Sequence, residues 1–144
     1  MKTINYCIRT IGLTAWTLFA FTGNAAAGPW YADPRVGAVG FSIGEKGYMG
    51  TGCEYFRNAP IFQKDFWEYD PHSDTWTQKA DFAGTARYFA VGFSIGAKGY
   101  IGTGKTCDGP VFGLRKDFWE YDPTENIWTQ KADIPGPDRS AAVG

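Results

Sequence analysis

The chain is poor in the residues on which most catalytic and nucleic-acid-binding sites depend. It has one histidine, His72, among 144 residues, which excludes most histidine-based metal sites and any Ser/His/Asp arrangement that does not use His72. Its 14 lysines and arginines are balanced by 15 acidic residues. Since a broad basic surface needs a clear excess of positive charge, we do not expect nucleic acid as a partner.

Long apolar runs are absent as well, except near the start of the chain. Lys2 and Arg9 accompany a short apolar stretch over residues 11–21, and the alanines at 25–27 are typical of a cleavage site. The stretch is too short for the roughly 20 residues that cross a bilayer. We therefore expect residues 1–27 to be a signal peptide, and the protein to be exported to the periplasm, the cell surface or the medium with no stable membrane span after cleavage.

Glycine and aromatic residues are, by contrast, abundant. The chain contains 19 Gly, 6 Trp, 8 Tyr and 11 Phe. All four are poor or mediocre helix formers, whereas strands and tight turns accommodate them well. The composition predicts an all-β protein.

Most of the chain consists of two consecutive copies of one sequence repeat. Residues 35–86 align without a gap with residues 87–138, at a period of 52, and 29 of the 52 positions are identical. Residues 28–34 form a lead-in, and residues 139–144 begin a third copy. Periods of this size are typical of propellers, solenoids and arrays.

Each copy has the pattern of four short antiparallel strands. In the first copy, strands are expected at 38–43, 48–52, 65–69 and 76–80, with a loop of about twelve residues at 53–64. Four strands in about 50 residues, without a helical stretch, predict one propeller blade.

The strand ends carry a motif that resembles the Kelch repeat. Tyr48-Met49-Gly50-Thr51-Gly52 is followed by Phe66-Trp67-Glu68-Tyr69-Asp70-Pro71 and Trp76, and the second copy repeats these segments in register at 100–104, 118–123 and Trp128. Gly-Thr-Gly stands where Kelch repeats usually have adjacent glycines. The chain is similar to bacterial secreted Kelch proteins and to the central domain of galactose oxidase.

This resemblance implies a Kelch-type β-propeller with two four-stranded antiparallel blades (35–86 and 87–138) and the first strand of a third (139–144). Propellers close with four to eight blades, so the chain is expected to be the N-terminal piece of a longer propeller. Open blade edges are a possible route to self-association.

Blade topology places the long loops and the connections between copies, 53–64 with 81–86 and 105–116 with 133–138, on one face of the molecule. The two copies differ most in the long loop, which favours a binding surface there, although unconstrained loops also drift in sequence. The candidate ligand-binding residues are Arg35, Arg87, Arg139, Tyr55, Phe56, Arg57 and Asp108.

The three arginines precede the innermost strand of each copy. In Kelch proteins that resemble this one, arginines at this place can contact acidic ligands. The alternative is a structural arginine that binds carbonyls or an acidic side chain, and its recurrence in every copy favours this alternative.

Two cysteines, Cys53 and Cys107, remain after signal cleavage, and they lie in the long loops of neighbouring copies. In an oxidising compartment they can form a disulfide. Their offset is 54 rather than 52, so they are not repeat equivalents, and the geometry may not permit the bond.

The stretch Gly99-Tyr100-Ile101-Gly102-Thr103-Gly104-Lys105-Thr106 matches the phosphate-loop pattern. Cys107-Asp108-Gly109-Pro110 then follows instead of a helix, so we expect no nucleotide. We also expect no metal and no cofactor. The interpretation is an exported, non-catalytic scaffold that binds a protein or a glycan. The alternative is part of a glycan-processing or galactose-oxidase-like enzyme whose active site lies in missing blades.

Overall fold

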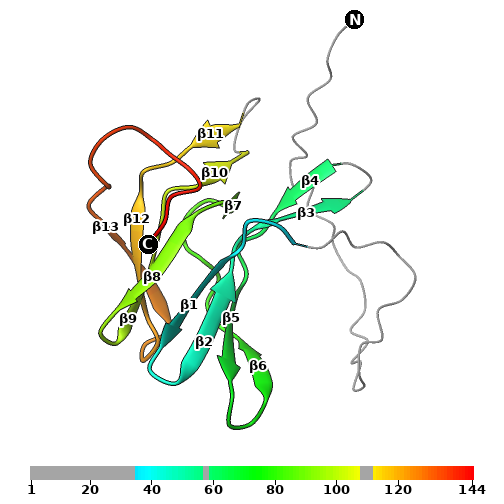
Figure 1. Ribbon diagram of the computed structural model, residues 1–144, viewed down its shortest axis with the longest axis vertical. Helices are drawn as coiled ribbons and strands as arrows, with labels where there is room; N and C mark the ends of the chain where they lie inside the picture. Colours follow the sequence, from blue (N-terminus) through cyan, green and yellow to red (C-terminus); the bar gives the residue numbers. More distant parts are fainter. Residues whose placement is uncertain (1–34, 57–58, 108–111) are drawn as a thin grey trace, which may run out of the picture.

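The computed structural model describes residues 35–56, 59–107 and 112–144, and these contain antiparallel strands and no helix, so the all-β prediction is confirmed for this part of the chain. An N-terminal sheet has the order β1-β2-β5-β6 and a C-terminal sheet the order β8-β9-β12-β13 (Figure 1). The strands of the first are β1 (Val39–Ile43), β2 (Lys46–Gly50), β5 (Phe66–Asp70) and β6 (Thr75–Gln78). Those of the second are β8 (Val91–Ile95), β9 (Lys98–Gly102), β12 (Phe118–Asp122) and β13 (Ile127–Lys131).

The two sheets follow the sequence repeat. Strands β1, β2 and β5 correspond to β8, β9 and β12 at an offset of 52 residues, and the pairing register of β1 with β2 is the same as that of β8 with β9. Gly44 and Gly96 each close the first hairpin of their sheet with φ 58°. Glycine adopts this left-handed conformation without the steric cost of a Cβ, which is why the turn recurs with glycine in both copies.

The two long loops contain more regular structure than the sequence analysis expected. Strands β3 (Cys53–Phe56) and β4 (Ala59–Phe62) form a hairpin in the first copy. In the second copy, β7 (Arg87–Tyr88), β10 (Lys105–Thr106) and β11 (Gly113–Leu114) form a small sheet of order β11-β10-β7. Strand pairing gives the loop backbone the hydrogen bonds that a folded segment needs.

The hairpin turns and the long connections lie at opposite ends of the molecule. The β1–β2, β5–β6, β8–β9 and β12–β13 turns gather at the bottom of Figure 1, whereas β3, β4, β7, β10 and β11 lie at the top. We call these the turn end and the loop end. This distribution follows from the antiparallel order of the strands, because each hairpin returns the chain to the end from which it came.

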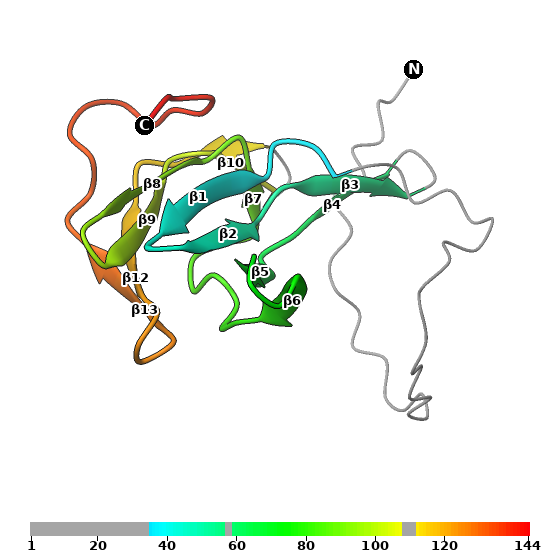
Figure 2. The same ribbon diagram turned by 60° about the horizontal axis from the view of Figure 1, so that its bottom comes forward.

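The core lies between the two sheets, which pack face to face (Figure 2). Each sheet has an aromatic face and a glycine face. The aromatic face carries Val39, Phe41, Ile43, Tyr48 and Phe66 in the N-terminal sheet, and Val91, Phe93, Ile95, Tyr100 and Phe118 in the C-terminal sheet. The glycine face carries Gly40, Gly47, Met49, Tyr69 and Trp76 in the first, and Gly92, Gly99, Ile101, Tyr121 and Trp128 in the second.

The aromatic face of the N-terminal sheet packs on the glycine face of the C-terminal sheet. Phe66 contacts Tyr121 and Trp128 edge-on, with ring centroids 4.8 and 5.0 Å apart. A Cβ added at Gly92 would overlap with the Val39 side chain. Glycine at this position therefore permits the close approach of the two sheets, and its recurrence in the sequence has a packing reason.

The expected first strand of a third copy is not formed in residues 139–144. The segment still makes the contacts that the second copy makes with the first. Gly104 donates to the Arg139 carbonyl as Gly52 donates to that of Arg87, and Ala141 donates to Phe89 as Phe89 donates to Gly37. By the 52-residue offset, a strand equivalent to β1 starts only at residue 143. Residues 139–142 therefore correspond to the lead-in of the earlier copies and not to a strand.

The expected signal peptide, residues 1–27, and the lead-in, 28–34, lie outside the described residues. Within the described part of the chain, no helix is long and apolar enough to cross a membrane.

Candidate functional site

The arginine that precedes the C-terminal sheet is clamped inside the chain. Arg87 is fully buried, and its guanidinium donates to both carboxylate oxygens of Asp117, at 2.6 Å (Nη1–Oδ1) and 2.7 Å (Nη2–Oδ2). It also donates to the carbonyls of Thr103 and Thr85, at 2.8 and 3.0 Å, and its guanidinium lies 4.8 Å from the centre of the Phe82 ring. All three nitrogens of Arg87 therefore already donate within the chain, which agrees with the structural role that recurrence favoured.

Arg35 makes the corresponding clamp in the first copy. It donates to Asp65 at 2.7 and 3.0 Å and, unlike Arg87, also to Glu54 at 2.9 Å. Its side chain is 26% exposed, whereas that of Arg87 is fully buried. Arg35 therefore combines a scaffold contact with access from outside.

Arg139 has no acidic partner among the described residues. It donates only to the backbone carbonyls of Pro137 and Pro135, at 3.1 and 2.8 Å. Of the three expected arginines, it is the one whose charge no carboxylate of the described chain neutralises, and it lies at the loop end beside Gly104. Arg139 thus keeps the charge that an acidic ligand requires.

The clamp aspartates are held in their charged form. Burial disfavours the charge on Asp117, but the hydrogen bonds from Arg87 and from the Trp119 indole outweigh burial and lower the pKa of its carboxyl below the usual value. The same balance of burial against hydrogen bonds from Arg35 and Trp67 lowers the pKa of Asp65. Each clamp is therefore an ion pair at neutral pH.

Of the four remaining predicted ligand residues, the structure describes two. Tyr55, in β3, is 39% exposed at the loop end. Phe56 ends the same strand. Arg57 and Asp108 lie outside the described residues.

The possible disulfide between Cys53 and Cys107 is not formed. The Cys53 thiol is free and buried in β3, where burial raises its pKa and its Sγ donates to the Glu54 carbonyl. The pairing of Cys53 with Phe62 across the β3–β4 hairpin, and the bridge from Cys53 to Val36, fix this position inside the first copy.

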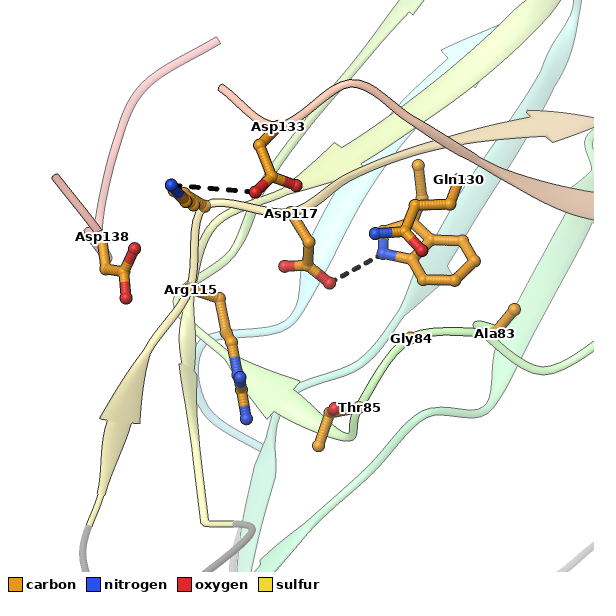
Figure 3. Close-up of a pocket in the computed structure, with 10 residues that line it drawn as sticks. Ala83, Gly84, Thr85, Arg115, Asp117, Gln130, Asp133 and Asp138 are labelled. Atoms are coloured by element: carbon orange, nitrogen blue, oxygen red, sulfur yellow. Dashed lines mark hydrogen bonds and ion pairs between the residues drawn. The ribbon is translucent and has the colours of Figure 1, made fainter. Parts of the chain in front are cut away.

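A cleft of about 440 Å³ opens at the loop end between the connections of the two copies. Ala83, Gly84 and Thr85 line it from the segment that follows β6, and the C-terminal repeat contributes Arg115, Lys116, Asp117, Trp119, Gln130, Asp133 and Asp138. Figure 3 shows Ala83 and Gly84 on one side of Asp117, and Asp133 and Asp138 on the other. Six of the ten lining residues are identical at the equivalent position of the other copy, and Trp119 and Gln130 come from strands β12 and β13.

The cleft combines both signs of charge with an aromatic surface. Lys116 pairs with Asp133 at 3.8 Å, and Arg115 donates to the Thr106 hydroxyl at 3.3 Å. Asp138 and Gln130 are exposed at its rim. Hydrogen-bond donors and acceptors are thus presented around the Trp119 ring, which the bond to Asp117 holds in place.

A second feature of the loop end is a group of aromatic rings around Lys105, which we call the Lys105 cluster. It consists of Phe62, Tyr88, Phe89, Phe112 and Lys105. Phe62 contacts Tyr88 and Phe112 edge-on at 5.2 and 6.0 Å, and the Lys105 ammonium lies 4.7 Å from the centre of the Phe112 ring. Phe89 has φ 52°, a conformation that a bulky residue rarely adopts.

Sequence reasoning did not find the cleft residues or the Lys105 cluster individually. A signal was available for the Lys105 cluster, because its residues occupy positions where the copies differ, whereas six of the ten cleft residues are identical in both copies. Phe89 stands where the first copy has Gly37, and Phe112 stands where it has Pro60. Tyr55 and Phe56 are predicted as ligand residues because each is an aromatic residue that occurs once, in a loop. The same criterion applies to Phe89 and Phe112.

The single histidine lies at the turn end, opposite these features, in the turn between β5 and β6, where its Nε2 is 3.1 Å from Glu45. Lys105 and Thr106 lie in β10 rather than at the start of a helix. In the described part of the chain, no group of three or more His, Cys, Asp or Glu side chains is arranged to hold a metal ion.

No protein-family model matches the chain, and no curated protein matches it. Among solved structures it is similar to one described as "Structure of YjhT", with a TM-score of 0.62 and 16% sequence identity. The similarity covers 74% of this chain and 40% of that one, so this chain spans well under half of its neighbour's length. At this identity the likeness shows the fold alone.

Proposed function

We propose that the chain is an exported, non-catalytic binding module whose cleft at the loop end takes a carbohydrate. The observation that carries this proposal is the composition of the cleft: the Trp119 ring lies among amide, carboxylate, guanidinium and ammonium groups of the C-terminal repeat, with Ala83, Gly84 and Thr85 of the first copy completing the lining. Its volume of about 440 Å³ falls within the range of small-molecule sites. A sugar offers hydroxyls to such groups and an apolar ring face to the tryptophan.

The architecture that we propose for this module is that of Kelch-type propeller blades. Two observations support it: four antiparallel strands in sequential order in each copy, and close face-to-face packing through the repeated glycines. The fold likeness covers 40% of the neighbour's length, which is compatible with further blades in a complete ring. Export rests on the composition of residues 1–27.

A broad flat protein contact would use little of the concave surface of the cleft. A protein ligand is therefore the second outcome of the experiment below. The alternative of a metal-dependent glycan-processing enzyme such as a galactose-oxidase-like one would need a group of metal ligands, and the described residues hold no set of three or more His, Cys, Asp or Glu side chains arranged for one.

Glycan-array screening of the exported protein, followed by calorimetric titration of the best sugar, tests the proposal. Gln130→Ala and Asp138→Ala should each weaken binding by roughly tenfold, since each removes about one hydrogen bond to the ligand. Glu125→Ala, an exposed substitution at the turn end, is the matched control and should leave the affinity unchanged. Binding of peptides but no glycans, or an affinity insensitive to both cleft variants, would contradict the proposal.

A further inference from the structure

The Lys105 cluster at the loop end joins the two copies of the repeat. Phe62 of the first copy contacts Tyr88 and Phe112 of the second edge-on, and the Phe89 ring lies 4.7 Å from that of Tyr88. Phe89 is 45% exposed and Phe112 is 51% exposed. Exposed apolar groups that adjoin one another mark interaction sites, whereas single exposed apolar residues do not.

Phe89 combines a bulky side chain with a backbone conformation that favours glycine. The backbone is left-handed at all three equivalent positions of the repeat, with φ 63° at Gly37, 52° at Phe89 and 56° at Ala141. Phe89 donates to the Gly37 carbonyl and accepts from the Ala141 amide, so it has a neighbour on either side within the described repeats. Its ring nevertheless stays half-exposed. A strained residue whose side chain gains little from burial indicates a function for that side chain.

Lys105 lies at the centre of a row of apolar side chains. It is paired in register with Tyr88 on one side and with Leu114 on the other, across strands β7, β10 and β11 at the loop end (Figure 1). Residues paired directly across a sheet share a face, so these three side chains lie on the same face of the small sheet. The opposite face carries Arg87 and Thr106, which are both fully buried. The row therefore lies on the outward face.

The first copy has the same row without a charge. Its equivalent positions carry Val36, Cys53 and Phe62. In the second copy, the Lys105 ammonium lies 4.7 Å from the centre of the Phe112 ring and 5.9 Å from that of Tyr88. Among the residues that the structure describes, no carboxylate pairs with this ammonium. The second copy therefore presents one cation without a counter-charge among aromatic rings.

The exposure of these rings is that of an open platform. Tyr55, which is 39% exposed, extends the platform, because the register of β3 with β4 places it on the same face as Phe62. Small-molecule sites bury about 70–90% of their ligand, and half-exposed rings on a surface do not enclose a ligand to that extent. A protein segment can instead cover several rings at once, and Tyr and Phe are enriched at the centres of protein contacts. The platform therefore fits a protein segment better than a small molecule.

A partner that covers the rings also covers the Lys105 ammonium. Burying an ammonium without a counter-charge is costly, so the partner must bring an anionic group to that point. We propose that the Lys105 cluster binds a protein segment in which an acidic side chain stands beside aromatic or other large apolar side chains. The carboxylate pairs with Lys105, and the apolar side chains pack on Phe89 and Phe112. This surface shares no residue with the cleft, and the proposal is independent of the carbohydrate site.

Selection of a displayed random-peptide library on the protein, followed by fluorescence polarisation of the enriched peptides, tests the proposal. The enriched peptides should carry Asp or Glu beside Phe, Tyr, Trp or Leu. Lys105→Gln should weaken their binding by about tenfold, since it removes one charge-assisted hydrogen bond. Lys105→Arg should restore most of the affinity, because a guanidinium keeps the charge and stacks on aromatic rings. Phe112→Ala should also weaken binding, because it removes half of the cation–π contact and a packing surface.

Two matched controls separate this surface from general charge effects and from the cleft. Lys64→Gln removes the same charge from an exposed lysine outside the cluster, and Gln130→Ala alters the cleft; both should leave the peptide affinity unchanged. Lys105→Gln should in turn leave the affinity for a glycan unchanged, so the two proposals fail separately.

Replacement of the acidic residue of an enriched peptide by its amide is the decisive measurement. The amide peptide should bind more weakly than the acidic one, and equally to the unsubstituted chain and to Lys105→Gln. An amide peptide that binds as tightly as the acidic one, or a selection that enriches no peptide with an acidic residue, would overturn the proposal. So would cosedimentation with anionic lipid vesicles in place of peptide binding, while circular dichroism confirms that the variants are folded.

Discussion

Arg87 and Asp117 form a two-pronged ion pair across thirty residues of sequence, in which the arginine is wholly buried and the aspartate also accepts from the indole of Trp119. The ion pair joins the start of the second repeat to the residue that directly precedes strand β12. Because the same pair forms between Arg35 and Asp65, the clamp is a property of the repeat rather than of one copy.

Asp117→Asn should destabilise the protein strongly. It leaves the guanidinium of Arg87 buried without its counter-charge, and such a loss costs about 3–5 kcal/mol of unfolding free energy. Asp65→Asn is the matched variant, and it should cost only about 1 kcal/mol, because Arg35 is partly exposed and keeps Glu54 as a partner. Urea denaturation measures both, and equal losses would contradict the assigned difference in burial.

The clamp aspartates also predict a loss of stability in acid. Their pKa values are lower in the folded chain than the usual value of about 4 in an unfolded one. The stabilisation that they provide is therefore complete above about pH 4 to 5 and is lost as the pH falls through the folded-state values. Thermal unfolding at a series of pH values should show this decline. In Asp117→Asn the decline should be shallower, and an unchanged slope would argue against the role of Asp117.

Gly92→Ala should destabilise the fold, whereas Gly40→Ala should not. The new methyl group at Gly92 overlaps with Val39 in the interface between the sheets, which as overpacking costs about 1–3 kcal/mol. At Gly40 the same methyl group meets nothing within 3.7 Å. Denaturant unfolding at a concentration where the protein is a single copy makes the comparison. A tolerated Gly92→Ala would mean that the sheets do not approach as closely as the structure shows.

Thr103→Gly should stabilise the protein. Thr103 has φ 59°, and its hydroxyl is buried without a hydrogen-bond partner among the described residues. Glycine removes the strain of the left-handed conformation and the unsatisfied hydroxyl, for a gain of about 1 kcal/mol. Thr129→Gly, on the exposed strand β13, is the control and should lower the stability by a few tenths to about 1 kcal/mol. A loss of stability at Thr103 would show that the hydroxyl has a partner in solution.

Much of the fold was predictable from the sequence because both copies of the repeat show the same pattern of strands and turns. Strands at matching offsets, turns at Gly44 and Gly96, and the separation of a turn end from a loop end all follow from a pattern that two copies share. The small β-structure of the long loops was not predictable, since β3 with β4 and β10 with β11 differ in sequence, and pairs as short as Lys105–Thr106 with Gly113–Leu114 leave no periodicity to detect.

The candidate site was predictable as a region and not as a set of residues. The loop end was expected to carry the variable connections, and the cleft lies there. Which side chains line it depends on how far each connection extends and where its backbone is anchored. For example, Ile134 donates to the Lys116 carbonyl and thereby brings Asp133 beside Lys116. No local rule of sequence specifies that contact.

The sequence by itself determined the all-β class, the 52-residue period and the residues that recur at each strand, because strand propensity and turn chemistry are local and are repeated in both copies. Only the tertiary structure decided what those residues do. It assigned Arg87 to an ion pair, left Cys53 a free thiol and, within the described part of the chain, buried Ile43 while its repeat equivalent Ile95 stays 62% exposed. These outcomes depend on which surfaces meet, and two identical segments of sequence can pack against different neighbours.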